Sequence, residues 1–418
     1  MNKEDYKIHI IGAGISGLIA ARVLEDNGFS PVVIEATETI GGRVKTDNLD
    51  GYQLDHGFQV LLTAYPAAKE YLDYESLDLQ KFLPGAAIFR NGKQIIIGDP
   101  LRDVSLLFPT LFSGIGTLSD KLKILKLNQR LKKKTEADIF SDEERSTLSY
   151  LRDFGFSEQM ISQFFKPFFS GIFLESQLET SSRMFEFVYK MFGEGHAALP
   201  KSGMQAIPKQ LFQNLKTTTF NFNTKVALVK DGEIILSTNE ILKSHFTIIA
   251  TDASDLIPNS KERSTKWNSC ETLYFETDKR LIRKPLIGLI PKNNTLINNI
   301  FYHTSLETHS SPKNELLSVT IVDSQNLSNE ELIKRVKREL KQHCGIGSCK
   351  FIRRYSIAKA LPKLNNLQYE MLPSQTHLTS GIFLAGDLQL NGSLNAAMIS
   401  GEKAALGVME MLSRPISK

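Results

Sequence analysis

The segment at residues 7–17 constrains the fold of this chain more than any other feature. It reads KIHIIGAGISG, so a short apolar strand leads into three spaced glycines and then into an Ala/Leu-rich helix. Glycines at these positions permit a sharp turn, a close approach of the backbone to a pyrophosphate, and tight packing of the helix on the sheet. The helix N-terminus also favours a negative charge. The segment therefore predicts a dinucleotide-binding turn in an α/β fold.

A second predicted strand, residues 31–34, supports this interpretation. It ends at Glu35 and Ala36. A carboxylate at that position can bind the ribose hydroxyls of the adenosine, and it disfavours a 2′-phosphate, so NADP is not expected. A glycine-rich turn without a nucleotide is the alternative, and the strand, helix and acid in register argue against it. The turn alone does not say which dinucleotide binds.

Three further segments resemble motifs of the flavin amine oxidase and phytoene desaturase superfamily. Residues 41–43, GGR, are similar to the loop that follows the second strand there. Residues 382–401 contain an apolar strand, GD, GSLNAA and a later SG, and they resemble the closing flavin motif. Residues 199–211, LPKSGMQAIPKQL, resemble the superfamily's proline, glycine–glycine, methionine motif. Ser202 and Ala396 stand where those motifs have glycine.

The resemblance implies that the cofactor is FAD, bound non-covalently by segments far apart in the sequence. In the superfamily, the arginine of GGR braces the pyrophosphate region, and the closing helix points toward the flavin. The motifs and the resemblance together predict these cofactor-binding residues: Gly12, Gly14, Ile15, Ser16, Gly17, Glu35, Ala36, Gly42, Arg43, Gly57, Phe58, Gln59, Val226, Gly386, Asp387, Leu394 and Asn395.

The resemblance also implies two interleaved domains. A Rossmann-like FAD-binding domain would comprise residues 1–60, 201–255 and 371–418, and an α+β substrate domain residues 61–200 and 256–370. At 418 residues and 41% hydrophobic, the chain can bury the cores of two domains. The first insert is predicted to be mainly helical and the second to form a sheet, followed by a helix that begins near Ser328.

Residues 164–174, FFKPFFSGIFL, are the most aromatic stretch of the chain. They resemble the desaturase segment that lines an elongated substrate cavity, which makes Phe165, Phe168 and Phe169 candidate substrate residues. A core helix that breaks at Pro167 is an equal alternative.

The nature of the substrate is predicted only in part. Residues 386–397 contain neither the cysteine nor the tyrosine that amine oxidases often have near their closing helix. We therefore expect an FAD-dependent oxidoreductase that takes a hydride from, desaturates or isomerises a small apolar substrate, such as an isoprenoid or polyene. A flavin amine oxidase, a protoporphyrinogen-oxidase-like enzyme and a non-catalytic flavin-binding scaffold stay open as alternatives.

No catalytic acid or base is assigned. His56 could transfer a proton, but a histidine hydrogen-bonded to the backbone is the favoured interpretation. No metal is expected, because His343, Cys344 and Cys349 lack the second half of a zinc site.

Charge and cysteine content limit the partners and the compartment. The net charge of +4 is too small to indicate nucleic acid binding. Basic residues interleaved with leucines at 121–134 predict either peripheral membrane contact or a solvated helix face, and the second is favoured. Three cysteines and no apolar run long enough to span a bilayer predict a cytoplasmic protein. The oligomeric state and the electron acceptor are not predicted.

Overall fold

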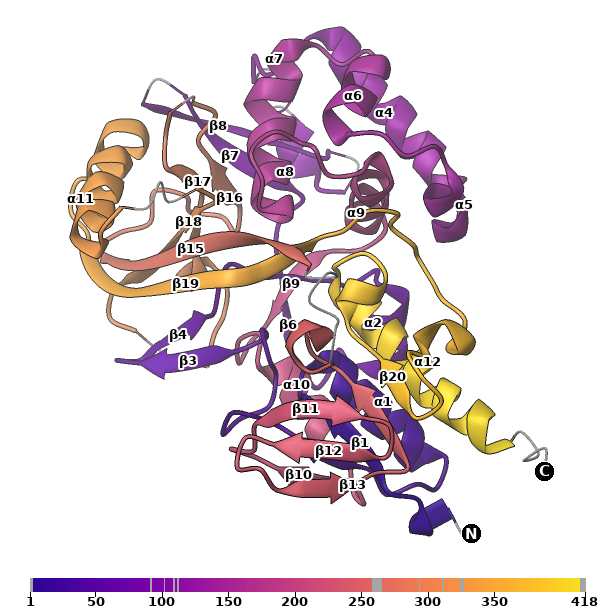
Figure 1. The fold of residues 1–418 in the computed structure, drawn as a ribbon. Helices are drawn as coiled ribbons and strands as arrows, with labels where there is room; N and C mark the ends of the chain where they lie inside the picture. The colour runs from indigo at the N-terminus through magenta and orange to yellow at the C-terminus, as the bar shows by residue number, and fades with distance from the viewer. Residues whose placement is uncertain are drawn as a thin grey trace.

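The fold was analysed in a computed structural model of the chain (Figure 1). The structure describes residues 3–90, 92–100, 102–107, 110, 113–257, 265–292, 294–309, 312–323 and 327–413.

A parallel sheet of five strands carries the N-terminal motif. Its strand order is β10 (Thr219–Asn221), β2 (Val32–Ile34), β1 (Ile8–Ile11), β14 (Phe246–Ile249) and β20 (Ile382–Leu384). Every neighbouring pair is parallel, and the three central strands are almost entirely apolar and buried. Parallel strands require cover on both faces, which explains these continuous apolar runs. The sheet brings the two ends of the chain and its middle side by side, and it confirms the predicted α/β fold class.

Two helices pack against each other on one face of this sheet. They are α1 (Ile15–Asp26), which follows the glycine turn, and α12 (Leu394–Ser413), close to the C-terminus (Figure 1). Glycines allow the close contact: a Cβ atom on Gly17 would lie 2.0 Å from the Gly12 carbonyl oxygen, and one on Gly401 would lie 2.3 Å from the Ser16 carbonyl oxygen. Neither position has room for a side chain.

A small antiparallel sheet covers the other face. It consists of β11 (Val226–Lys230), β12 (Glu233–Leu236) and β13 (Ile241–Lys243). Its apolar side chains share a core cluster with those of the parallel sheet. Lys230 pairs with Glu233, so Asp231 and Gly232 form a tight two-residue hairpin loop.

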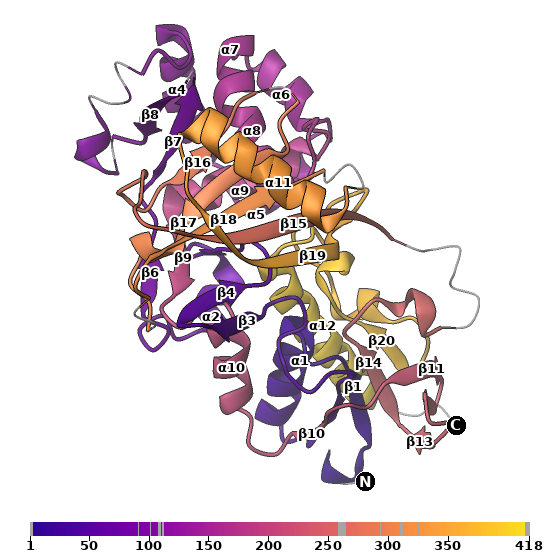
Figure 2. The same ribbon diagram turned by 90° about the vertical axis from the view of Figure 1, so that its left-hand side faces the viewer.

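The second large sheet has seven strands and mixed direction. In order, these are β19 (Lys350–Lys363), β15 (Lys266–Thr277), β18 (Glu315–Ile321), β17 (Ile297–Tyr302), β16 (Ile287–Leu289), β7 (Gly85–Arg90) and β8 (Lys93–Gly98). Helix α11 (Asn329–Glu339) covers its outer face (Figure 2). The predicted helix start is confirmed, because Ser328 and Glu331 form a reciprocal capping box.

Shorter elements connect the two large sheets. They are β3 (Thr46–Leu49), β4 (Tyr52–Asp55), β5 (Leu61–Leu62), α2 (Pro66–Tyr71), β6 (Leu79–Lys81), β9 (Ala197–Pro200) and α10 (Ala206–Gln213).

The predicted helical region lies at the opposite end of the molecule from the two termini (Figures 1 and 2). We call it the helical cap. It consists of α4 (Leu118–Lys132), α5 (Glu136–Ser141), α6 (Thr147–Asp153), α7 (Glu158–Met160), a π-helical turn at Ile161–Phe165, α8 (Lys166–Phe173) and α9 (Ser182–Glu194).

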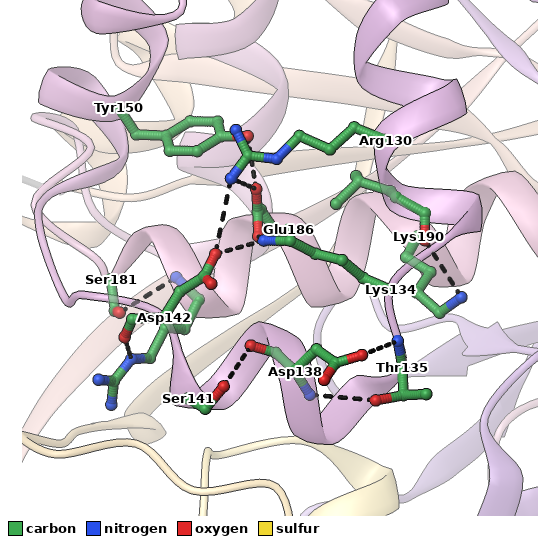
Figure 3. A network of polar contacts seen from close by, with 12 residues as sticks. Arg130, Lys134, Thr135, Asp138, Ser141, Asp142, Tyr150, Ser181, Glu186 and Lys190 are labelled. Carbon is green, nitrogen blue, oxygen red and sulfur yellow. Dashed lines mark hydrogen bonds and ion pairs between the residues drawn. The ribbon is translucent and has the colours of Figure 1, made fainter.

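An ionic network around the buried carboxylate of Glu186 ties the cap helices together (Figure 3). The carboxylate of Glu186 in α9 is almost fully buried, and it accepts hydrogen bonds from the Tyr150 hydroxyl at 2.6 Å and from the Lys134 ammonium at 2.9 Å. Arg130 lies 3.6 Å from Glu186 and from Asp142, and Lys134 also binds Asp142. Removing one partner of such a buried pair is strongly destabilising, because the other charge loses its compensation. The network therefore holds the cap in one arrangement.

The predicted domain boundaries remain a proposal. All five strands of the parallel sheet fall within residues 1–60, 201–255 and 371–418, and all seven strands of the mixed sheet within 61–200 and 256–370. This distribution supports the proposed division.

Candidate functional site

A cavity of about 1680 Å³ runs from the glycine turn of the parallel sheet to the helical cap. Pockets for one small ligand usually measure about 300–1,000 Å³. This cavity has space for a large ligand beside the glycine turn and for a second one farther along.

Backbone hydrogen bonds fix the glycine turn at the first end. The Gly12 N–H group donates to the Ile34 carbonyl at 2.9 Å, and the Gly41 N–H group donates to the Ala13 carbonyl at 2.8 Å. The Glu35 carboxylate accepts hydrogen bonds from the N–H groups of Ala13 at 2.8 Å and Thr37 at 2.9 Å. Glu35 therefore both lines the cavity and supports the turn beside it.

The turn leaves open space where a dinucleotide pyrophosphate would lie. A Cβ atom on Gly14 would have no neighbour within 4 Å, and the same holds for Gly386. Both glycines line the cavity, and Gly14 is the N-cap of α1, so unpaired helix N–H groups face this region. An open backbone cradle at a helix N-terminus fits FAD, which the residues around it would hold.

Arg43 joins the N-terminal loop to the C-terminal motif. Its guanidinium donates to the Asp387 carboxylate and, at 3.1 Å, to the Ala360 carbonyl, and it lies 5.3 Å from the centre of the Trp267 ring. The side chain of Gln59 donates to the Arg43 carbonyl at 2.9 Å. A half-exposed cation at the cavity wall can also attract phosphate.

The next part of the wall comes from residues 56–58 and from β19. Gly57 has φ +94°, and a Cβ atom there would lie 3.0 Å from the side chain of Ile357. The His56 ring lies 3.1 Å from the Asp47 carboxylate and 4.4 Å, between ring centres, from Tyr355. A carboxylate therefore lies beside this ring, and the expected hydrogen bond to the backbone stays a prediction.

Most predicted cofactor residues meet in the cavity wall. Those that line it are Gly12, Gly14, Ile15, Ser16, Glu35, Gly42, Arg43, Gly57, Phe58, Gln59, Gly386, Asp387 and Leu394.

Four predicted cofactor residues lie outside the cavity wall. Gly17 serves helix packing, Ala36 is exposed on the surface, and the Val226 side chain is buried in the apolar layer between two sheets. Asn395 is fully buried, and its side-chain oxygen accepts the Ala67 N–H at 3.0 Å. The predicted contacts of these four residues with the cofactor stay predictions.

Ala396, which replaces a motif glycine, does not narrow the site. Its side chain is fully buried in the core, whereas Ala397 lines the cavity. The extra methyl group therefore points away from the space a cofactor would occupy.

The second end of the cavity passes into the cap, where aromatic rings line it together with charged residues such as Arg145 and Glu179. Four phenylalanines of the aromatic segment line it, namely Phe164, Phe168, Phe169 and Phe173. Phe165 is a correction: it is fully buried and packs against the rings of Phe156 and Phe185 instead. The helix does not break at Pro167, because a π-helical turn precedes it and accommodates the missing N–H group.

Two parts of the wall were missed by sequence reasoning. Residues 356–363 of β19 line the cavity beside Trp267, but the strand lacks a clear alternation of buried and exposed residues. Arg102 also lines the cavity, and it donates to the Phe192 and Gly195 carbonyls at the end of α9. Burial lowers the pKa of the Arg102 guanidinium. The one tryptophan of the chain, Trp267, was the only available signal.

The described residues contain no group of three or more histidine, cysteine, aspartate or glutamate side chains placed to hold a metal ion. None of their helices combines the length and apolar character that crossing a bilayer requires.

Comparisons with known proteins agree with this geometry. The model of the family described as flavin-containing amine oxidoreductase matches residues 15–409. Protoporphyrinogen oxidase 2 of Arabidopsis thaliana is 25% identical over 169 residues, which are 40% of this chain and 32% of that protein. The 4,4'-diapolycopene oxygenase of a Methylomonas species is 30% identical over 152 residues, 34% of this chain and 29% of that protein. The matched segments thus span about a third of these relatives.

The fold itself is shared over almost the whole chain. Cyclohexylamine oxidase from Brevibacterium oxydans superimposes with a TM-score of 0.69 at 15% identity, covering 98% of this chain and 100% of that one. The family match over most of the chain confirms the predicted FAD cofactor and enzyme class. The chain belongs to the flavin-containing amine oxidoreductase family and is an FAD-dependent oxidoreductase.

Proposed function

We propose that the enzyme oxidises, desaturates or isomerises a small apolar substrate of the isoprenoid or polyene class. The observation that carries the proposal is the cluster of aromatic rings in the cap end of the cavity, beyond the space beside the glycine turn. Large rings exclude water and hold an extended hydrocarbon without hydrogen bonds. A relative named for diapolycopene, a polyene, supports the same class.

The proposed roles of the residues follow from their positions. Gly14, Gly42 and Arg43 hold the pyrophosphate, Glu35 holds the adenosine ribose, and Asp387 positions Arg43. FAD, when bound, accepts the hydride equivalent. Phe164 and Phe168 orient the substrate and keep water out, and such positioning supplies much of the rate in this kind of reaction. No side chain is assigned as a catalytic acid or base.

Oxidation of an amine is the second candidate function. It is supported by the family model and by the likeness to cyclohexylamine oxidase over nearly the whole chain. The same cavity could hold a small amine, because it also has polar wall residues such as Asp99 and Glu179.

Anaerobic flavin reduction tests the proposal. The yellow holoenzyme is mixed with a C30 or C40 polyene in detergent, with protoporphyrinogen, or with cyclohexylamine, and flavin absorbance is followed. Bleaching by the polyene alone is the expected result for an oxidation or a desaturation. Isomerisation leaves the flavin spectrum unchanged, so products are also separated by chromatography. Bleaching by the amine alone overturns the proposal, and no change of flavin or polyene indicates a non-catalytic scaffold.

The place of action is part of the same proposal. We propose a cytoplasmic enzyme that makes peripheral contact with a membrane, since apolar substrates of this class reside in bilayers.

A further inference from the structure

The outward side of helix α4 exposes a row of leucines. Leu118 is 76% exposed, Leu122 68% and Leu125 43%. Their spacing of four and three residues places them in one stripe along the helix. The opposite side of α4 is anchored in the cap core by the fully buried Leu127 and by Leu131. The exposed leucines therefore do not contribute to the packing of α4 against the cap core.

Basic side chains flank this leucine stripe. Helical spacing places Lys126 and Lys133 along one edge and Lys121 and Lys132 along the other. Lys126, Lys132 and Lys133 are exposed. Several basic residues of the predicted run also make contacts inside the cap. Arg130 and Lys134 bind Glu186 (Figure 3). Lys123 donates to the Gly155 carbonyl, and the Lys126 ammonium lies 5.8 Å from the centre of the Phe154 ring.

The stripe adjoins the cap end of the cavity. Lys121, Ile124, Leu125 and Asn128 line the cavity from the side of α4 that lies next to the stripe. Leu125 belongs to both surfaces, since it is partly exposed and also lines the cavity. Leu125 and Ile124 therefore offer an apolar molecule a path from the stripe into the cavity, between the polar side chains of Lys121 and Asn128.

We propose that the leucine stripe of α4 inserts into the interface of an anionic lipid bilayer and that the substrate enters the cavity there directly from the lipid. Exposed leucines bordered by lysines match such a bilayer, because the leucines enter the acyl boundary while the lysines bind anionic headgroups. This inference rests on the proposed function for its substrate, but the docking itself is measured without substrate.

Vesicle flotation tests the docking surface with the FAD-loaded, full-length protein. The wild type is expected to float with vesicles of phosphatidylcholine and phosphatidylglycerol, and far less with phosphatidylcholine alone or at high salt. The double variant Leu118→Ser, Leu122→Ser should partition at least about tenfold less, because apolar burial drives insertion. Neither leucine lines the cavity, so flavin content should not change.

The matched control is Ile241→Ser with Leu372→Ser, two residues that are 53% and 65% exposed elsewhere on the molecule. It should float like the wild type. The proposal is overturned if the wild-type protein does not bind anionic vesicles, or if the stripe variant floats like the wild type. It is also overturned if the control variant loses as much binding as the stripe variant.

A fluorescent reporter tests the orientation. Leu122→Trp should show a blue shift of tryptophan emission when anionic vesicles are added, whereas Leu372→Trp should not. Equal shifts, or none at position 122, contradict insertion by this stripe. Flavin reduction by a detergent-solubilised polyene reports the proposed function separately, so failure of one leaves the other measurable.

Discussion

Replacing Gly14 by valine tests whether the glycine turn holds the pyrophosphate of FAD. A Cβ atom at Gly14 would meet no protein atom within 4 Å, and the backbone there has φ −75° and ψ −179°, which valine adopts without strain. The side chain would project into the cavity instead. The variant should therefore fold but should exclude the cofactor.

The expected losses of stability and of FAD affinity follow from the position of Gly14 at the helix N-terminus and in the cavity wall. Because Gly14 is the N-cap of α1, valine should cost the apoprotein up to about 1 kcal/mol of unfolding free energy. FAD affinity should fall at least about 100-fold, or about 2.8 kcal/mol. At an FAD concentration of about 100 times the dissociation constant, the wild type gains about 2.7 kcal/mol of stability from the ligand. The variant should lose most of that gain.

Two assays measure the effect: titration of apoprotein with FAD by flavin fluorescence, and thermal melting with and without FAD. Gly347→Val is the matched control, since Gly347 also has no neighbour within 4 Å but does not line the cavity. Gly17→Ala is the contrasting variant, and it should destabilise the apoprotein itself, because its Cβ atom would lie 2.0 Å from the Gly12 carbonyl oxygen. Wild-type FAD affinity in Gly14→Val would refute the assigned pyrophosphate position.

Three further predictions concern the cofactor, the aromatic segment and pH. Glu35→Ala should weaken FAD binding by ~1 to 3 kcal/mol in a fluorescence titration, because the hydrogen bonds between the carboxylate and the ribose hydroxyls are lost. An unchanged FAD affinity would mean that the adenosine binds elsewhere. Phe165→Ala should lower the free energy of unfolding in urea by ~3 to 5 kcal/mol, because the ring is fully buried. Phe168→Ala should keep the wild-type stability and bound FAD, but flavin reduction by an apolar substrate should be slower, because Phe168 lines the cavity. Equal behaviour of the two variants would contradict the division between core and cavity wall. Burial lowers the pKa of His303 to about 4, below its ordinary 6.5. The unfolded chain binds a proton at His303 below about pH 6.5, whereas the folded protein does not do so until about pH 4. The free energy of unfolding should therefore fall by up to about 3 kcal/mol as the pH is lowered from 6.5 to 4. His303→Gln should flatten this part of the curve of unfolding free energy against pH.

Local chemistry in the sequence was enough to predict the elements around the nucleotide. A turn that needs glycine at Gly12, an acid that must follow the second strand at Glu35, and a capping box at Ser328 are all encoded within a few residues. The glycine turn and the capping box agree with the structure, because each depends on backbone conformation or on a hydrogen bond across a short segment.

The tertiary structure alone decided which faces of these elements border the cavity. Phe165 and Phe168 are three residues apart in a helical segment, yet one packs into the core and the other lines the cavity. Composition could not separate them, because the π-helical turn at Ile161–Phe165 changes the direction of the side chains that follow it.

Long-range partners were equally beyond the sequence. Arg43 and Asp387 are 344 positions apart, and they meet only because β2 and β20 lie in one parallel sheet. The buried side-chain oxygen of Asn395 accepts a hydrogen bond from the Ala67 N–H group, 328 positions away, and no local pattern predicts that partner. The sequence by itself thus determined the kind of site, because the glycines of the turn and the acid after the second strand act locally. The packing of distant segments determined which side chains form the walls of that site.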